Sequence, residues 1–237
     1  MTDNANSHKE WYFTAQRTSV MGCYTTAFEQ GIMTLVLGNA GKGLKILDVG
    51  GGDGQHSVHV RSLGHEPVLL EYDWAPIEIH LARGSGIPAI QASGLDLPIA
   101  KETFDAVMTI EVSVCFTGLN DANVAFFSDV HRVLRPGGLF LLTAFNRDSY
   151  INILKKFKKN RPGWEDMYYR EGMGDYKRKL SDAGFTVEHC WGYRWLPFTR
   201  QSNSRLIPRL AGLEKLLLLR HLPHFSPWLF FVARKKP

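Results

Sequence analysis

The chain has 237 residues, enough for one large or two small domains with a substantial apolar core. Hydrophobic residues make up 44% and charged residues 22% of it, which excludes an intrinsically disordered protein. The net charge of +5 is mild, and the densest basic cluster (residues 155–161) is interpreted as a solvated helix face, so no nucleic-acid partner is expected. Three widely spaced cysteines indicate neither disulfides nor a zinc site. A polar N-terminus and the lack of a long apolar run predict a cytoplasmic protein without a transmembrane segment.

In the first two thirds of the chain, short apolar runs alternate with stretches of helical periodicity. A helix is predicted for residues 18–37, ended by glycines, followed by short apolar runs that predict strands at 45–49, 67–71, 87–91, 105–110 and 139–143. Helices are predicted between them at 55–63, 76–83 and 123–133. Strands that alternate with helices indicate a parallel sheet covered on both faces.

The last third differs in pattern. Helices are predicted at 150–159 and 176–183, and two late strands at 185–193 and 228–233. A basic, leucine-rich stretch lies between these strands at about 205–222. There is no internal repeat and no low-complexity linker, so one domain over residues 1–237 is favoured over two.

A glycine-rich turn follows the first predicted strand. The sequence there is Asp48-Val49-Gly50-Gly51-Gly52-Asp53-Gly54, with glycine at every other position from Gly50 to Gly54. A dinucleotide-binding fingerprint would need a further glycine at Gln55, and no Lys-Ser/Thr pair follows as in a phosphate-binding loop. Two acids in the turn suit a positively charged ligand, and open parallel sheets bind ligands at the carboxyl ends of their strands.

A carboxylate at the end of the second strand would bind the hydroxyls of a ribose. Two residues qualify: Glu71 stands at the end of the apolar run, and Asp73 fits when counted back from the next helix. Glu71 is preferred because it belongs to the strand end itself, and Tyr72 would then lie beside an adenine. Surface acids without a ligand are the alternative.

Together these segments resemble the class I S-adenosylmethionine-dependent methyltransferases of the type 11 group. Residues 46–54 resemble their motif I, Leu97-Pro98 the stretch before the fourth strand, and residues 132–138 the turn into the fifth. Residues 183–185 resemble the entry to the sixth strand, and residues 230–235 resemble the last strand. The resemblance implies a Rossmann-like α/β fold with a seven-stranded, mostly parallel sheet whose last strand is antiparallel. It also implies S-adenosyl-L-methionine as cofactor and S-adenosyl-L-homocysteine as product.

The resemblance assigns roles to residues at the predicted strand ends. Residues 50–54 would hold the methionine part and Glu71 the ribose, while Ile110 and Glu111 would lie between cofactor and acceptor. Many relatives carry an acid beside the adenine where this chain has Ser93, followed by Gly94, so that contact departs from the family pattern. The implied cofactor-binding set is Asp48, Gly50, Gly51, Gly52, Asp53, Gly54, Glu71, Tyr72, Asp73, Ser93, Gly94 and Ile110.

The acceptor side is less well marked. Glu111 is the candidate catalytic base, with a cofactor or helix-cap contact as the alternative. We expect an N-terminal helical lid at about 8–40 and substrate-cap insertions at about 146–175 and 200–226. The predicted acceptor pocket comprises Tyr12, Arg17, Asn146, Trp164 and Tyr168, which suits an O- or N-methylated, aromatic or lipophilic small molecule from small-molecule biosynthesis.

Alternatives stay open for the 205–222 stretch, for the acceptor and for catalysis itself. The stretch at 205–222 is interpreted either as a helix packed on the domain or as a contact with a membrane surface or lipophilic substrate. The acceptor could instead be RNA or protein, although no RNA-binding module is appended and Thr109-Ile110-Glu111-Val112 replaces the Asn-Pro-Pro-Tyr type of motif. A non-catalytic partner subunit of the same fold is the other alternative.

Overall fold

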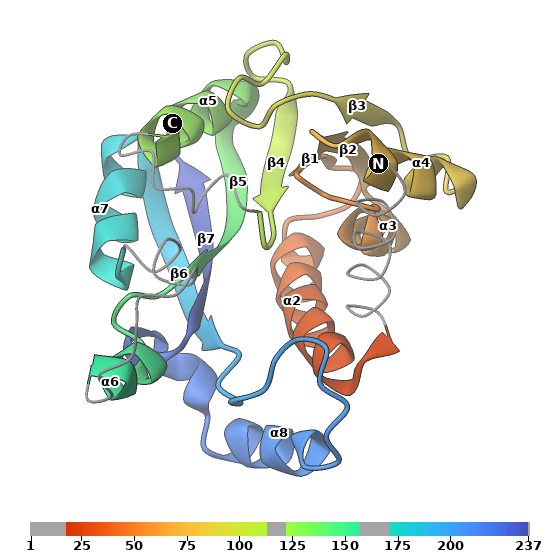
Figure 1. Ribbon diagram of the computed structural model, residues 1–237. Coiled ribbons are helices and arrows are strands. Elements are labelled where there is room, and N and C mark those ends of the chain that lie inside the picture. Colours follow the sequence, from red (N-terminus) through yellow and green to blue (C-terminus); the bar gives the residue numbers. More distant parts are fainter. Residues whose placement is uncertain (1–17, 113–121, 157–170, 237) are drawn as a thin grey trace, which may run out of the picture.

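One seven-stranded sheet organises the molecule. The computed structural model describes residues 18–112, 122–156 and 171–236, and the strand order is β3-β2-β1-β4-β5-β7-β6 (Figure 1). Strands β1 to β5 run parallel, whereas β7 is antiparallel to both of its neighbours. This confirms the predicted sheet and its antiparallel last strand. The strands are β1 (Lys45–Val49), β2 (Glu66–Glu71), β3 (Ala89–Gln91), β4 (Phe104–Thr109), β5 (Leu134–Phe145), β6 (Phe185–Tyr193) and β7 (Trp228–Lys235).

Helices cover the sheet, which is why the central strands are almost continuously apolar. In β1, Ile46, Leu47 and Val49 are fully buried. α3 (Gln55–Ser62) and α4 (Trp74–Ala82) pack near β2, and α5 (Ala122–Val133) and α7 (Met173–Asp182) pack beside each other near β5 and β6. α2 (Val20–Asn39) packs against α3 and α8 (Ile207–Leu216), while α6 (Tyr150–Lys156) follows β5.

The strand register brings four chain segments to one edge of the sheet. β1 ends at Val49 opposite Leu70, Glu71 at the end of β2 pairs with Gln91, and Asp48 pairs with Met108 of β4. The segments that leave these parallel strands are residues 50–54, 71–73, 92–94 and 110–112. We call this the carboxyl edge, and it is where ligands of such sheets bind.

Two element boundaries differ from the predictions for identifiable reasons. α2 begins at Val20 because the Ser19 side chain accepts a 2.9 Å hydrogen bond from the backbone N–H of Gly22 and caps the helix. β5 begins at Leu134, five positions before the predicted residue 139, because Leu134 already pairs with Phe104 before the register shifts. The turn expected at residues 132–138 contains this bulge, with Gly137 at φ +74°.

The leucine-rich stretch is helical over part of its length. α8 covers Ile207–Leu216, after which Leu218 takes a left-handed conformation and two short 3₁₀ turns follow, η3 (Leu219–His221) and η4 (Pro223–Phe225). In Figure 1 the arrowhead of β4 points toward α2, and α8 lies beyond α2. The stretch therefore lies at the same end of the molecule as the carboxyl edge.

Candidate functional site

The glycine turn after β1 has a backbone that explains its alternating spacing. Gly50, Gly52 and Gly54 have φ values of +69°, +57° and +79°, a region that side chains other than glycine rarely adopt. Gly51 has an ordinary φ but no room, because a Cβ there would lie 2.6 Å from the Asp48 carboxylate. A Cβ on Gly54 would lie 2.2 Å from Nδ1 of His80. A Cβ on Gly50 would lie 2.7 Å from Val112 Cγ1. The turn therefore needs glycine for conformation at three positions (50, 52 and 54) and for close packing at three (50, 51 and 54).

Glu71 links this turn to the end of β2. Its Oε2 accepts a 2.9 Å hydrogen bond from the Gly52 N–H, and its Oε1 accepts bonds of 2.8 and 3.0 Å from the N–H groups of Tyr72 and Asp73. A carboxylate has about four acceptor sites, so one remains for a ligand hydroxyl. Tyr72 is 70% exposed beside it. The carboxylate is thus held at the carboxyl edge by three backbone N–H groups, and its contact with a ribose stays a prediction.

The choice between the two acids can be tested by substitution. Glu71→Ala is expected to weaken cofactor binding about tenfold or more, because it removes both the ribose acceptor and the bond that holds Gly52. Asp73→Ala is the matched control, since Asp73 stands at the N-cap of α4 and makes no side-chain cap bond there. Isothermal titration with S-adenosylmethionine gives both affinities. The opposite order of losses would make Asp73 the ribose ligand.

Asp48 lies beneath the turn, almost completely buried. Its Oδ2 accepts a 2.7 Å hydrogen bond from the Ser57 hydroxyl at the first turn of α3. Burial raises the pKa of the Asp48 carboxyl to about 6, although the Ser57 bond and nearby histidines oppose the rise. A carboxylate that is costly to ionise in the empty fold becomes easier to ionise when a positively charged ligand lies above it.

The raised pKa gives a pH-dependent prediction. The folded protein holds this proton at pH values where the unfolded chain has lost it, so stability falls as pH rises from about 4 to 6. Asp48→Asn keeps an acceptor for Ser57 without the charge. It is expected to raise the free energy of unfolding by about 1–3 kcal/mol at pH 7.5 and to change little at pH 4. Urea denaturation at both pH values tests this, with exposed Asp96→Asn as control; a loss of equal size at both would refute it.

Asp53 is buried, and its carboxylate forms an ion pair within the chain. Its Oδ2 pairs with Arg83 Nη2 at 2.5 Å, and Arg83 Nη1 donates to the Asp53 carbonyl oxygen at 2.8 Å. Arg83 directly follows α4, so this double contact fastens the glycine turn to that helix. The expectation that Asp53 offers its charge to a cationic ligand therefore loses its basis, while Asp48 keeps that role as a prediction.

The remaining predicted cofactor contacts lie at the same edge. Ser93 and Gly94 follow β3 and are half-buried, and the Ser93 hydroxyl accepts a 3.1 Å bond from the Leu95 N–H. The hydroxyl hydrogen is thus still available as a donor. Ile110 is buried directly after β4. Their contacts with adenine and methyl donor stay predictions.

Glu111, the candidate base, has an unusual backbone and buried charged partners. Its φ is +58°, and its N–H donates a 2.8 Å bond to the Thr143 hydroxyl of β5. Its carboxylate forms an ion pair with Arg200 and lies 3.6 Å from Nη1 of Arg194. A residue other than glycine at a positive φ costs about 1–3 kcal/mol of backbone strain, and such residues cluster at functional sites. Burial raises the pKa of Glu111 even though Arg200 opposes the rise.

A second acid, Glu29 of α2, shares Arg200 with Glu111. Glu29 is fully buried; its Oε2 lies 3.9 Å from Arg200 Nη2 and 3.4 Å from His56 Nε2, and its Oε1 accepts a 3.1 Å bond from the Tyr193 hydroxyl. Burial would raise the pKa of Glu29, but Arg200 and His56 together lower it. The carboxylates of Glu29 and Asp48 raise the pKa of His56, although burial and Arg200 oppose the rise. We call Glu29, His56, Glu111, Arg194 and Arg200 the buried charge cluster.

The buried charge cluster does not follow from the sequence, apart from Glu111. It joins α2, α3, the end of β4 and the segment after β6. One signal marks Glu29: the buried face of α2 carries Met21, Thr25 and Ile32, and Glu29 stands among them at helical spacing. Nothing local marks Arg200, which belongs to an irregular segment.

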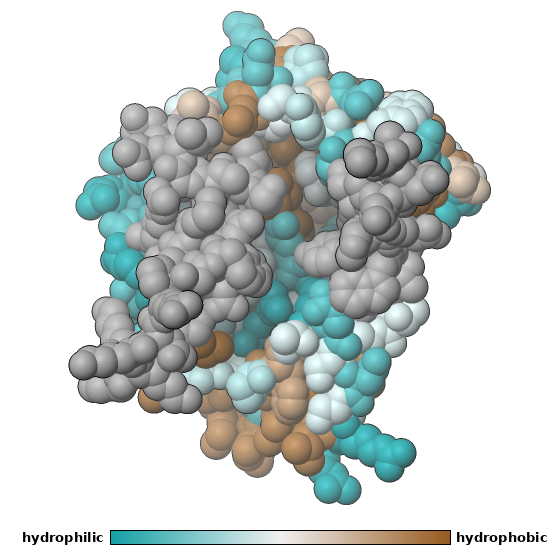
Figure 2. Space-filling view, in the orientation of Figure 1, coloured by the Kyte–Doolittle hydropathy of each residue, from teal (hydrophilic) through white to brown (hydrophobic). Residues whose placement is uncertain are grey.

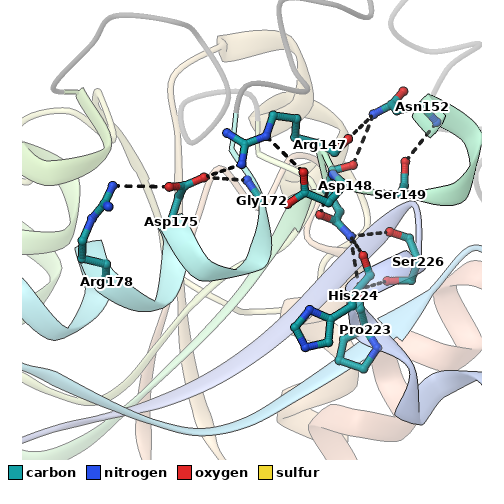
Figure 3. Close-up of polar contacts among 11 residues, drawn as sticks. Arg147, Asp148, Ser149, Asn152, Gly172, Asp175, Arg178, Pro223, His224 and Ser226 are labelled. Carbon is teal, nitrogen blue, oxygen red and sulfur yellow. Dashed lines mark hydrogen bonds and ion pairs between the residues drawn. The ribbon is translucent and has the colours of Figure 1, made fainter. Parts of the chain in front are cut away.

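The residues directly after β5, predicted to line an acceptor pocket, bond instead to other parts of the chain. Asn146 is fully buried, and its Nδ2 donates to the carbonyl oxygens of Pro223, His224 and Ser226 at 3.2, 2.9 and 2.9 Å. Its amide therefore binds the η4 region of the chain. Figure 3 shows the neighbouring Arg147 between Asp148 and Asp175, at 3.2 and 3.0 Å. The predicted pocket residues Tyr12, Arg17, Trp164 and Tyr168 lie outside the described residues.

Metal ligands do not gather anywhere in the described part of the chain. Within residues 18–112, 122–156 and 171–236, no group of three or more His, Cys, Asp or Glu side chains could hold a metal ion. Over those same ranges, no helix is long and apolar enough to cross a membrane.

Known proteins match both the sequence and the fold. A family model described as a methyltransferase domain matches residues 47–142. The uncharacterized methyltransferase sll0829 of Synechocystis is 36% identical over 154 residues, covering 61% of this chain and 68% of that protein. The fatty-acid O-methyltransferase of Mycolicibacterium smegmatis is 30% identical over 106 residues, covering 43% of this chain and 37% of that protein. Matches to two Arabidopsis thaliana proteins span only 16% of the length of each.

Among solved structures, an S-adenosylmethionine-dependent methyltransferase from Mesorhizobium loti has a TM-score of 0.60 at 18% identity, covering 82% of this chain and 92% of that one. At this identity the likeness concerns the fold. The family match at residues 47–142 covers the glycine turn, the end of β2 and the start of the segment after β4, which are the parts that build the carboxyl edge.

Proposed function

Because the chain belongs to the class I S-adenosylmethionine-dependent methyltransferases, we propose that it methylates an oxygen or nitrogen atom of a small aromatic or lipophilic molecule. The observation that carries the cofactor half is the contact between Gly52 and Glu71, which joins the glycine turn to a ribose-binding carboxylate. The acceptor half is supported by the fatty-acid O-methyltransferase relative and by the apolar character of the 205–222 stretch.

When bound, S-adenosylmethionine supplies an electrophilic methyl group on a sulfonium. The chain's residues position it: the glycine turn admits close approach of the methionine part, Glu71 orients the ribose, and Asp48 places negative charge beneath the turn. In-line displacement needs orientation of the acceptor and exclusion of water more than it needs protein nucleophiles.

Glu111 is the proposed base where the acceptor carries a proton. Burial brings its pKa closer to neutrality, which suits a general base, and it directly follows β4 and Ile110 at the carboxyl edge. Glu111→Gln is expected to lower turnover about tenfold or more, to remove the acid limb of the pH–rate profile, and to leave cofactor affinity nearly unchanged. A variant that loses stability but keeps its pH–rate profile would assign Glu111 to holding Arg200 instead.

The lid and cap are proposed to act as one unit over the acceptor. The Ser19 hydroxyl donates to the Arg200 carbonyl at 2.5 Å, and the backbone N–H groups of Val20 and Met21 donate to Asn203 Oδ1 and to the Ser202 carbonyl, both at 3.0 Å. These bonds tie the start of α2 to residues 200–203. Through these bonds, the segment proposed as lid (about 8–40) contacts the segment proposed as cap (about 200–226).

Calorimetry with S-adenosylmethionine and S-adenosylhomocysteine tests the first half of the proposal. Micromolar to low-millimolar binding is expected, and absence of binding at millimolar cofactor would overturn it. Radiolabelled methyl transfer to a panel of fatty acids, phenols and amines, against bulk RNA and protein, tests the second half. Label in RNA or protein would favour the macromolecular alternative, and cofactor binding without transfer to any class would favour a non-catalytic subunit.

A further inference from the structure

An exposed apolar surface covers the end of the molecule that carries α8. Its members are leucines and one phenylalanine between 48% and 77% exposed: Leu206, Leu213, Leu216, Leu217, Leu218, Leu222 and Phe225. We call it the leucine surface. Figure 2 shows hydrophobic residues gathered at this end, below a recess with hydrophilic residues in it. Such a concentration is unusual on a soluble protein and indicates an interaction site.

Packing of α8 on the domain does not account for the leucine surface. The inward face of the helix is formed by Ile207, Leu210, Ala211 and Glu214, of which Ile207 is 1% exposed and joins a small core with Met21. The Tyr24 hydroxyl binds Glu214 and fixes this face toward α2. The packed-helix interpretation of residues 205–222 therefore explains one face, and the leucines on the other face have no cover among the described residues.

The charges around the leucine surface have one sign. Arg205, Arg209, Lys215 and Arg220 are all exposed, while Glu214 is the only acid in the sequence between residues 205 and 225 and points inward to Tyr24. Exposed leucines flanked by cations match the interfacial region of an anionic bilayer. A second copy of the chain fits less well, because a two-fold contact would bring these cations against each other.

We propose that the leucine surface docks on an anionic phospholipid membrane, with the leucines among the acyl chains and the four cations at the phosphates. The surface lies at the end of the molecule that carries the carboxyl edge. α8 packs on α2, and Ser19 at the start of α2 is bonded to Arg200. Docking would therefore bring the acceptor side close to the bilayer. That a membrane-dissolved acceptor enters from there rests on the proposed function; docking itself does not.

Vesicle binding tests the docking directly, without cofactor or acceptor. The full chain is sedimented with vesicles of phosphatidylglycerol and phosphatidylcholine in equal parts, and with phosphatidylcholine alone. Binding to the anionic vesicles is expected to be at least tenfold tighter and to weaken as salt rises. The double change Leu216→Ser/Leu217→Ser is expected to weaken it about tenfold. The matched control is Leu35→Ser/Leu81→Ser, because these two leucines are 54% and 53% exposed but lie outside the leucine surface. This control should leave vesicle binding unchanged.

The cations are tested in the same assay. Arg205→Gln/Arg209→Gln/Lys215→Gln is expected to weaken binding to anionic vesicles about tenfold, whereas exposed Lys42→Gln/Lys101→Gln/Lys177→Gln should not. Absence of vesicle binding, equal losses in surface and control variants, or a dimer that Leu216→Ser/Leu217→Ser converts to monomer would each overturn the proposal. Because no methyl transfer is measured, failure here leaves the calorimetric test of the proposed function untouched.

Discussion

Gly52→Val is expected to lower the affinity for S-adenosylmethionine at least a hundredfold, which corresponds to about 3 kcal/mol. Gly52 is buried at φ +57°, a conformation that a β-branched residue does not hold. The backbone would have to leave this region, and the Gly52 N–H would then lose its bond to Glu71. The turn and the Glu71 carboxylate, which we propose binds the ribose, would thus be disturbed together, whereas a surface substitution would disturb neither. Isothermal titration of the folded variant measures the loss.

A matched glycine separates the site effect from general strain. Gly43 has φ +72°, is exposed, and precedes β1 at the opposite edge of the sheet; a Cβ added to it would meet nothing within 4 Å. Gly43→Val should lower the free energy of unfolding by about 1–2 kcal/mol, because valine is strained in the left-handed backbone conformation. Its cofactor affinity should nevertheless equal that of the unchanged chain. Equal affinities for the two variants would show that the glycine turn does not hold the cofactor.

The fold is predictable where local patterns decide it. β1 and β6 have the bounds expected from the sequence. For β1 the reason is local, because a short, mostly apolar run that ends in glycines leaves few alternatives for a buried strand. The predicted β5 begins five residues too late, since its first pairing, Leu134 with Phe104, depends on a bulge that only the neighbouring strand creates. Tertiary pairing, rather than propensity, sets that boundary.

The candidate site divides in the same way. The glycine turn is one contiguous stretch of sequence, and its contact with Glu71 follows from the parallel register of β1 and β2. The buried charge cluster instead joins Glu29 and Arg200, which are far apart in sequence and carry no motif. Asn146 shows the opposite error: its place after β5 suggests a pocket, yet its amide satisfies the carbonyl groups of η4. Position at a strand end predicts proximity to the site, but not the partner of the side chain.

Arg200→Met is expected to destabilise the protein by about 3–5 kcal/mol, because Arg200 is 5% exposed and serves two buried carboxylates. Methionine fills similar volume but leaves Glu29 and Glu111 buried without their shared cation. Urea denaturation measures the change. Arg234→Met is the matched control: its ion pair with Glu188 is 44% and 32% exposed, so about 1 kcal/mol or less is expected.

The pH dependence identifies the cause of this loss. In the unchanged chain the pKa of Glu29 is lowered, so its contribution to stability is present at neutral pH and is lost as pH falls through the folded pKa. Without Arg200 the pKa of Glu29 should rise above its unfolded value and the already raised pKa of Glu111 should rise further, so stability should then increase on acidification from about pH 7 to about pH 5. The double variant Glu111→Gln/Arg200→Met should recover part of the loss at neutral pH, since one buried charge is gone. A loss that is independent of pH and is not relieved by Glu111→Gln would point to lost packing around residue 200 instead of uncompensated charge.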